Sequence, residues 1–449
     1  MSLARPETDP DVTPRRLAVL AIPALGVGVL SALVLWILER AADLLGGVLY
    51  KTVPGALGVD PSGWWIILVL TATGLAVGIV LTVMPGHGGP DSATTELMGP
   101  PLPLKALPGL AIATLLSLAG GVSLGPENPI IAINAAVVVA ILARLIPRIP
   151  TQLAILLAGA STIGALFGTP VAAALLFTGI FATLKAGGSL WDRLFLPVAA
   201  AGAAAVTMHL LGAPPFAFDL PDYGAPQAID FVTGTLLTCG IVLIGMVTLF
   251  AFPWFYRALH ALRHPILITT AGGLILGILG FIGGPITMFK GLTQMGELLQ
   301  NPGDYDPGQL ASIAGIKALA LLVAASALFR GGRIFPATFI GVALGLLGNA
   351  LFPGIPIGLA VACGVIGIVI VVARDGWLAL FLAVAVAGDV SLLPMLCVIV
   401  LPAWLLVSAA PEFRIVPPVP DETAAARSGT AGSGATGSAR PAEGGAPTS

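Results

Sequence analysis

A single carboxylate stands in the middle of a long uncharged stretch. Glu127 lies in Gly125-Pro-Glu-Asn-Pro129, and no other charged residue occurs between Lys105 and Arg144. Glycine and proline end one apolar run here and open the next, so the carboxylate is expected at a helix N-terminus. Inside a membrane such a group is costly and indicates an ion-transport site. The alternative is a simple helix cap, which the macrodipole would favour by about 0.3–1 kcal/mol.

Two more breaks of the same kind interrupt the apolar sequence. Gly86-His-Gly-Gly-Pro90 follows a run that ends at Val83, and Gly332-Arg-Ile-Phe-Pro336 separates two later runs. We expect their glycines to turn backbone N–H groups toward a ligand and Pro90 to begin a new helix. One helix end supplies only about half a charge, so replacing an anion's hydration shell requires several ends aimed at one point. The three breaks are therefore predicted to converge in the middle of the membrane.

The composition of the 449-residue chain assigns it to the membrane. Hydrophobic residues make up 57%, charged residues 9%, and the mean hydropathy is +1.01, whereas soluble domains carry about 25% charge. The net charge of −2 gives no indication of a nucleic-acid partner. Cysteines and histidines lack metal-ligand spacing, so no metal, cofactor or disulfide is expected. Gly121-Val-Ser-Leu-Gly125 fits the hydrolase pattern G-x-S-x-G, but its membrane flanks argue against an enzyme.

Polar and apolar segments divide the chain into three parts. These are a cytoplasmic N-terminus at 1–16, a membrane domain at 17–410 with halves 17–211 and 231–410 and a linker at 212–230, and a disordered cytoplasmic tail at 411–449. Arg15 and Arg16 place the N-terminus in the cytoplasm, because they stand immediately before the first span. The tail is rich in Ala, Gly and Ser and cannot bury a core. Several apolar runs are too short to span, which indicates broken or re-entrant helices around a cavity.

The two halves resemble each other at one place. Gly125 to Pro129 and Gly332 to Pro336 share the pattern G-x-x-x-P between apolar helices. Broken helices at corresponding places in two halves point to a transport site, although 57 glycines and 38 prolines leave a chance match as an alternative. Close helix packing is expected at three small-residue pairs, which are Gly74-x-x-x-Gly78, Gly273-x-x-x-Gly277 and Gly341-x-x-x-Gly345.

With these motifs the sequence resembles the CLC family of chloride channels and proton-coupled chloride transporters. Its three breaks look like the family motifs G-S-G-I-P, G-[KR]-E-G-P and G-x-F-x-P, in the same order and spacing, within residues 65–410. The resemblance is to a divergent prokaryotic branch. It implies an all-α integral membrane protein with about 18 helices, many broken or re-entrant, in two inverted-topology halves. It also implies a homodimer with one pore in each subunit.

The resemblance implies roles for individual residues. Glu127 matches the gating glutamate, whose carboxylate competes with the anion for its outer site. The expected anion-binding positions are Gly86, His87, Gly88, Gly89, Pro90, Gly125, Pro126, Asn128, Pro129, Gly332, Arg333, Ile334, Phe335, Pro336 and Asp389. His87 replaces the family's serine with a histidine, a residue type that can change charge near neutral pH. Asp389 stands close to the place of the family's pore tyrosine, and it is expected either to face the pore or, equally, to be a helix-end group beside Gly388.

The remaining family positions bear on proton coupling. Gly179 and Ile180 stand where the exchangers carry an internal proton glutamate, and neither side chain can titrate. Lys317 also agrees with the family in position, and we expect it to snorkel or to pair with an acid rather than to bind the anion. Passive, pH-gated conduction is therefore favoured over proton-coupled antiport on the same fold.

The sequence as a whole predicts transport of a small inorganic anion, chloride or a similar halide such as fluoride. The alternatives from other classes are a secondary transporter of organic anions and a membrane protein without transport. The expected partners are the anion, protons in the coupled case, the lipid bilayer and a second copy of the chain, with no nucleic acid. The expected location is the cell membrane, with several spans and with both termini in the cytoplasm.

Overall fold

The structure is a computed structural model that describes residues 14–416 except 96, 184–188, 214–215, 217 and 219. Most of the expected N-terminal segment and the tail from residue 417 onward lie outside the described residues. The described residues up to Arg414 form one compact unit.

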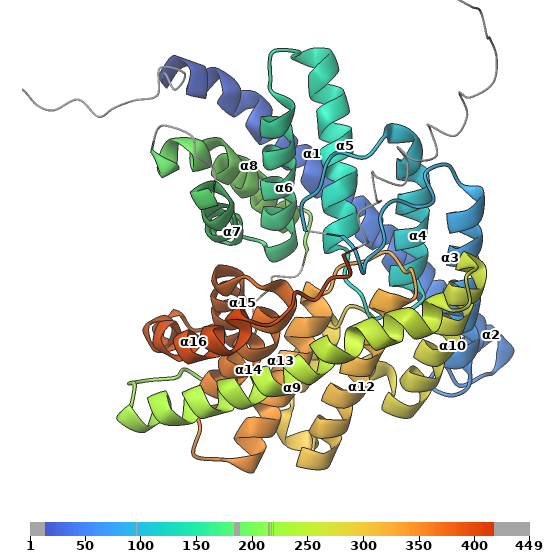
Figure 1. Ribbon diagram of the computed structural model, residues 1–449, viewed down its shortest axis with the longest axis vertical. Helices are drawn as coiled ribbons and strands as arrows, with labels where there is room; N and C mark the ends of the chain where they lie inside the picture. Colours follow the sequence, from blue (N-terminus) through green and yellow to red (C-terminus); the bar gives the residue numbers. More distant parts are fainter. Residues whose placement is uncertain are drawn as a thin grey trace, which may run out of the picture. The chain divides into compact units, whose positions relative to one another are not determined.

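Helices make up almost all of this unit (Figure 1). They are α1 (Pro14–Gly47), α2 (Val53–Leu57), α3 (Trp65–Val83), α4 (Leu107–Ala119), α5 (Glu127–Leu145), α6 (Thr151–Phe167), α7 (Pro170–Thr183), α8 (Leu190–Leu210), α9 (Ala228–His260), α10 (Pro265–Gly283), α11 (Leu292–Gln300), α12 (Pro307–Ser326), α13 (Ile334–Leu351), α14 (Ile357–Ala373), α15 (Gly376–Ala387) and α16 (Leu393–Ser408). A π-helical turn, Val48–Thr52, joins α1 to α2, and short 3-10 turns stand at four other places, among them Pro285–Thr287 before α11. The expected all-α architecture is confirmed.

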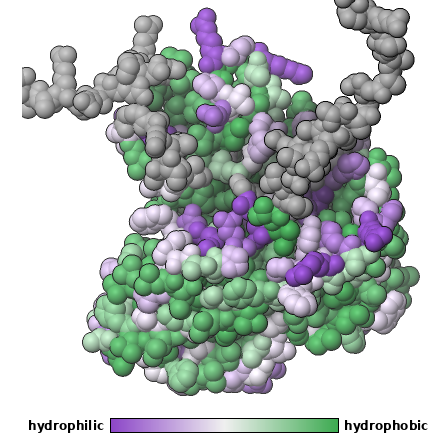
Figure 2. Space-filling model, in the orientation of Figure 1, coloured by the Kyte–Doolittle hydropathy of each residue, from purple (hydrophilic) through white to green (hydrophobic). Residues whose placement is uncertain are grey.

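Nine of the described helices are long and apolar enough to cross a membrane. Their outward faces are hydrophobic, as on α9 and α16, where Leu236, Val247 and Leu401 are each more than half exposed. Figure 2 shows that the face carrying these two helices is hydrophobic over most of its area. Such faces are stable against lipid chains and would be costly in water, because burying apolar area is the main source of stability.

The remaining apolar helices are too short to span a bilayer. The apolar sequence from Thr151 to Thr183 is divided into α6 and α7, because Gly168 takes a left-handed conformation with φ +68° and Pro170 opens the next helix. Proline at a first helical position lacks only an N–H group that would have no partner there. Broken helices of this kind are the expected response to a cavity at membrane depth.

Small residues bring helices from the two halves into close contact. A Cβ atom added at Gly74 or Gly273 would overlap backbone of the facing helix, so α3 and α10 touch through their backbones there. Gly341 of α13 and Gly364 of α14 meet in the same way. The expected role of these glycines in close helix packing is confirmed. The α3–α10 contact also joins a helix of the first half to a helix of the second.

Candidate functional site

The second and third glycine–proline breaks pair directly with each other. Gly125 and Gly332 form an isolated antiparallel bridge, in which the Gly125 N–H donates to Gly332 O at 2.9 Å and the Gly332 N–H donates to Gly125 O at 2.6 Å. Helix α5 begins two residues after Gly125, and α13 begins two residues after Gly332. The bridge therefore sets the starts of two helices from opposite halves beside each other.

Glu127 occupies the place where these two helices begin. Its side chain is 1% exposed, and its Oε1 accepts a hydrogen bond from the Phe335 N–H at 2.8 Å. The glutamate begins α5 and at the same time places its carboxylate at the N-terminus of α13, where the helix dipole favours negative charge. Its Oε2 is buried and has no hydrogen-bond partner among the described residues.

The two bridge glycines leave room for this carboxylate. A Cβ atom built at Gly125 or at Gly332 would overlap the Glu127 carboxylate. Any larger residue at either position would displace the Glu127 side chain from α13, because the added Cβ atom and the Glu127 carboxylate would overlap. The glycines of these two motifs are explained by close approach to Glu127.

The first break joins the other two through Arg330, four residues ahead of α13. The buried guanidinium donates to three carbonyl oxygens of the break, those of Gly88 at 2.7 Å and of His87 and Gly89 at 3.0 Å. The carbonyl groups of the break therefore face a cation. The N–H groups were expected to face a ligand, and the contacts of His87, Gly88 and Gly89 do not show that arrangement. No helix begins at Pro90 in the described part of this loop, because the chain continues through turns up to the short Leu104–Ala106 segment. The expectation of a third helix N-terminus was wrong.

A small cavity of about 20 Å³ lies between the first and second breaks. It is lined by Pro90, Ser92, Thr95, Leu110, Asn128, Pro129, Ala132 and Gly331. The Ser92 hydroxyl accepts from the Gly331 N–H at 3.0 Å and bonds to the Phe329 carbonyl, so it links the loop after the first break to the segment before α13. A cavity of this size holds about one water-sized species. Residues of the first two breaks contribute to its lining, and the third break is represented only by its neighbour Gly331.

Two predicted positions lie apart from this cluster of contacts. The His87 side chain is exposed, and its Nδ1 lies 3.0 Å from Leu81 O at the end of α3. Asp389 stands between α15 and α16, where its Oδ2 accepts from the Tyr223 N–H at 2.9 Å and its Oδ1 from the Ser391 N–H at 2.8 Å. These contacts identify Asp389 as a turn and helix-capping residue, so its expected place at the pore is not supported.

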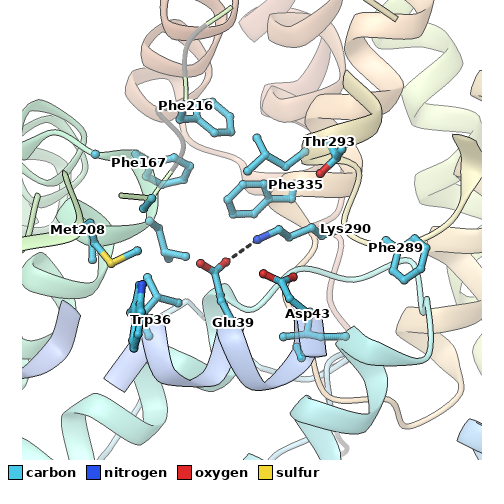
Figure 3. A pocket seen from close by; sticks show the side chains of 18 of the residues that line it. Trp36, Glu39, Asp43, Phe167, Met208, Phe216, Phe289, Lys290, Thr293 and Phe335 are labelled. Atoms are coloured by element: carbon cyan, nitrogen blue, oxygen red, sulfur yellow. Dashed lines mark hydrogen bonds and ion pairs between the residues drawn. The ribbon is translucent and has the colours of Figure 1, made fainter. Parts of the chain in front are cut away.

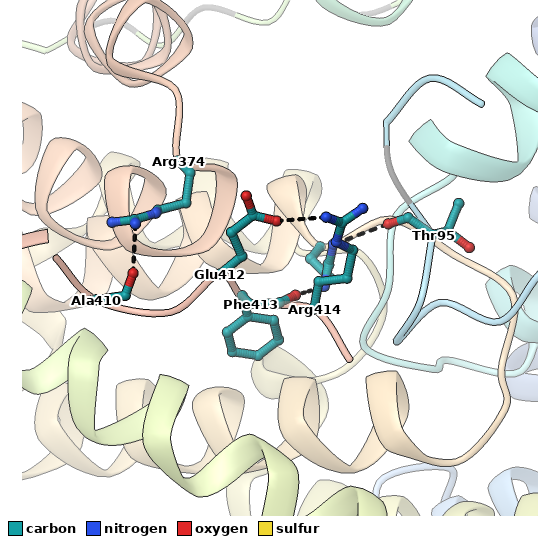
Figure 4. Close-up of polar contacts among 7 residues, drawn as sticks. Thr95, Arg374, Ala410, Glu412, Phe413 and Arg414 are labelled. Carbon is teal, nitrogen blue, oxygen red and sulfur yellow. Dashed lines mark hydrogen bonds and ion pairs between the residues drawn. The ribbon is translucent and has the colours of Figure 1, made fainter. Parts of the chain in front are cut away.

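Arg333 turns its side chain away from Glu127 and holds the segment that follows α16. Its guanidinium donates to Phe413 O and, at 3.4 Å, to Thr95 O, and it lies 5.4 Å from the centre of the Phe413 ring. Phe413 is buried and stacks on Phe252 of α9 with ring centres 4.4 Å apart. Figure 4 shows this segment with Arg374 bonded to Ala410 O. The end of the compact unit is thereby fixed to the third break, and through Arg333 to Thr95 in the loop after the first.

A second and larger cavity, of about 1260 Å³, is lined in part by Phe335 (Figure 3). Lys290, which precedes α11, reaches into it and forms an ion pair with Glu39 of α1. The Lys290 ammonium also lies 5.6 Å from the centre of the Phe335 ring, and the Phe335 N–H donates to Glu127. The Glu127 site and this cavity are therefore neighbours.

Lys317 neither snorkels nor pairs with an acid, contrary to expectation. It is fully buried, and its ammonium donates to the carbonyl oxygens of Thr287, Met288 and Phe289 at 3.1, 2.9 and 2.7 Å. Three carbonyl dipoles replace the missing counter-ion and satisfy all three donors of the ammonium group. Lys317 fixes the loop that carries Lys290.

Sequence reasoning missed four residues that organise the site. Arg330 and Ser92 each stand two residues from a recognised motif. Lys290 is a single charge beside an apolar run, and Glu39 stands next to Arg40 at the end of another. Their positions next to motifs or inside uncharged stretches were the available signals. Among the described residues, no group of three or more His, Cys, Asp or Glu is arranged to hold a metal ion.

Comparisons with known proteins agree with this architecture. A family profile described as voltage gated chloride channel matches residues 72–408. The chain is 46% identical over 404 residues to "Putative ion-transport protein YfeO" of Escherichia coli (strain K12 / DH10B), which covers 89% of this chain and 96% of the relative. The protein of the same name from Escherichia fergusonii matches with the same identity and the same coverage.

Two solved structures share the fold. That of a slow cyanobacterial Cl⁻/H⁺ antiporter has a TM-score of 0.74 at 16% identity and covers 94% of this chain and 100% of its own. That of a CLC-type fluoride/proton antiporter has a TM-score of 0.68 at 18% identity and covers 90% of this chain and 98% of its own. With the profile match and the 46% identical relatives, these findings make the chain a multi-pass membrane protein of the CLC family, an ion-transport family and not one of enzymes.

Proposed function

We propose that the chain carries a small inorganic anion, chloride or a similar halide, across the cell membrane along a path that Glu127 gates. The observation that carries this proposal is the 2.8 Å hydrogen bond from the Phe335 N–H to Glu127 Oε1. Helix N-termini bind free anions through the same N–H groups. The carboxylate and a transported anion therefore compete for the start of α13, and the path is closed while the carboxylate is there.

Protonation of Glu127 opens the path in this scheme. A neutral carboxyl group gains less from the N-terminus of α13, so its side chain can leave and an anion can take its place. The adjoining cavity beside Phe335 offers room for that movement. The 20 Å³ cavity between the first and second breaks is a second stop for the anion, next to Ser92 and Asn128.

We favour passive, pH-gated conduction over proton-coupled antiport. Gly179 and Ile180 supply no titratable group where an inner proton acceptor is expected, and Asp389 is engaged with Tyr223 and Ser391. Chloride and fluoride are both candidates, because the N–H groups around Glu127 recognise negative charge rather than a particular halide. We further propose that the protein works as a homodimer with both termini in the cytoplasm, the side on which Arg15 and Arg16 favour the start of α1.

The test is anion efflux from liposomes that contain the purified full-length protein, with chloride, fluoride and nitrate compared. Parent flux is expected to rise as the pH falls, because acid protonates Glu127. Glu127→Gln mimics the protonated state and is expected to raise flux at neutral pH by about tenfold, the factor that 1.4 kcal/mol represents, and to remove most of the pH dependence. Glu297→Gln, the same change at an exposed position on α11, is the matched control.

Proton uptake measured in the same liposomes separates the two mechanisms. An anion gradient that drives protons uphill in the parent, and fails to do so in Glu127→Gln, would establish antiport and refute the passive mechanism. Equal flux and equal pH response in the parent and in Glu127→Gln would remove Glu127 from the path and overturn the proposal.

A further inference from the structure

Lys290 and Glu39 meet across the large cavity from two separate parts of the fold. Glu39 projects from α1, and Lys290 stands in the short loop between the Pro285–Thr287 turn and α11 (Figure 3). The two side chains are 24% and 26% exposed. Each charge is thus partly desolvated and depends on the other for compensation.

Buried contacts hold the Lys290 backbone in one place. Lys317 donates to the three carbonyl oxygens just before Lys290, and the Phe289 N–H donates to Gly121 O at 3.0 Å. Gly121 lies on the chain that leads into the second break, and Tyr50 packs edge-on against Phe289 with ring centres 5.5 Å apart. A loop fixed in this way presents the ammonium group with little backbone freedom, which favours a binding role.

The Lys290 ammonium stands between the cavity and the Glu127 site. Phe335 contacts both, because its ring lies 5.6 Å from the Lys290 ammonium and its N–H donates to Glu127. The other charged or titratable residues that line the cavity are Arg40, Asp43, Tyr50, Lys51 and His209. Of these, Asp43 pairs with Arg40 at 3.8 Å, whereas Lys290 pairs with Glu39.

We infer that Lys290 is a docking site for the transported inorganic anion at the cavity side of the gate, and that the Glu39 carboxylate occupies this site when no anion is bound. The inference rests on the proposed anion transport. An arriving anion exchanges with Glu39 at the ammonium group, so one negative charge replaces another and the partly buried Lys290 is never left unpaired. The bound anion then waits beside Phe335 until Glu127 leaves the N-terminus of α13.

Glu39→Gln tests the competition between Glu39 and the anion. Removing the competing carboxylate is expected to lower the half-saturating chloride concentration for efflux by about two- to fivefold, the equilibrium factor that corresponds to an ion pair of modest strength. Asp43→Asn removes the same charge from the same helix and cavity but from the partner of Arg40. The logarithm of the half-saturating chloride concentration is expected to change less than half as much in Asp43→Asn as in Glu39→Gln. Equal shifts in the two variants would overturn the inference in favour of a general charge effect.

Changes at Lys290 complete the test. Lys290→Met is expected to raise the half-saturating chloride concentration, and Lys290→Arg is expected to restore it, because a guanidinium still attracts anions. Glu39→Gln combined with Lys290→Met is expected to behave like Lys290→Met alone, since Glu39 acts only through Lys290. A Glu39→Gln effect that persists without Lys290 would overturn the inference, and so would unchanged half-saturation in Lys290→Met.

The proposed function and this inference can fail separately. If Glu127→Gln alters flux and pH response as described above while Glu39→Gln equals the parent, only the docking site is refuted. If Lys290→Met does not yield folded protein, Lys290→Arg and Glu39→Gln still test the docking site, because each replaces a side chain by one of similar size.

Discussion

Arg330 Nε donates to the Gly88 carbonyl oxygen at 2.7 Å, across 242 positions of sequence. This bond, with those to His87 O and Gly89 O, fixes the first glycine–proline break to the chain that enters α13. The guanidinium is 5% exposed, so water cannot replace it as a donor. The two halves of the protein therefore share one buried polar network beside Glu127.

Arg330→Lys is expected to destabilise the protein although it keeps the charge. An ammonium group cannot reproduce the planar fork that serves three carbonyls, and each carbonyl left unpaired in the interior costs about 1–3 kcal/mol. Thermal unfolding in detergent measures the effect. Arg257→Lys is the control, because that arginine is exposed and bonds only within its own helix, to Pro253 O. Equal melting temperatures for the two variants would contradict the structural role of Arg330.

Gly332→Ala is expected to open the gate. Its new methyl group would overlap the Glu127 carboxylate, so the side chain must leave the N-terminus of α13. Anion flux should rise at neutral pH and respond less to acid, as in Glu127→Gln. The measurement is repeated in a Glu127→Ala background, where no carboxylate is left to displace. An equal effect of Gly332→Ala in both backgrounds would show that the glycine acts on something other than Glu127.

His87→Ser is expected to remove a second, smaller pH response. The exposed ring stands in the first break, so a proton on it adds positive charge near the path and favours anion entry. The effect is isolated in a Glu127→Gln background, where the gate no longer titrates. Flux between pH 5 and 8 should rise with acid in Glu127→Gln and stay level when His87→Ser is added. Identical profiles would exclude His87 from the ion site.

Asp389→Asn is expected to lower stability at pH 7 but not in strong acid. Hydrogen bonds from the Ser391 hydroxyl and from the Tyr223 and Ser391 N–H groups hold the pKa of the Asp389 carboxyl below its usual range. A group with a depressed folded pKa stabilises above its unfolded pKa, about 3.9, and loses this contribution as the pH falls through the folded pKa. Melting temperatures of parent and variant should therefore approach each other toward pH 3. Asp222→Asn, at an exposed position beside Tyr223 in the 212–230 linker, is the control.

Gly273→Ala is expected to destabilise the contact between α3 and α10. The added methyl group would overlap Leu70 O, which is backbone and cannot turn aside, at an expected cost of about 1–3 kcal/mol. Gly240→Ala on α9 meets no heavy atom within 4 Å and should be neutral, or gain up to about 1 kcal/mol from helix propensity. A smaller loss of thermal stability in Gly273→Ala than in Gly240→Ala would contradict the close packing.

The sequence predicted the helical class and Glu127 because both have local causes. An uncharged stretch with one carboxylate between Gly125 and Pro129 is visible without any tertiary information, and so are apolar runs of spanning length. Arg330, Ser92 and Lys290 act through partners more than 200 positions away, so no local pattern distinguishes them from other polar residues.

The capping role of Asp389 and the loop that follows Pro90 both have local explanations. Asp389 follows Gly388, a residue with φ +72° at the end of α15, and an aspartate after such a stop is a normal helix-capping residue. Pro90 permits a helix start but does not require one, and the Arg330 bonds to the preceding carbonyls fix that segment as a loop instead. In both places capping and long-range hydrogen bonds outweighed the motif.

The Gly125–Gly332 bridge restricts how the protein can move. A rocking-bundle cycle, in which one half tilts rigidly against the other to expose a site alternately to each side, would break both of its hydrogen bonds next to Glu127. It would also pull apart the backbone contact between α3 and α10. The bridge and this contact therefore resist such a movement, and in the proposed mechanism the Glu127 side chain moves while the backbone around it stays in place.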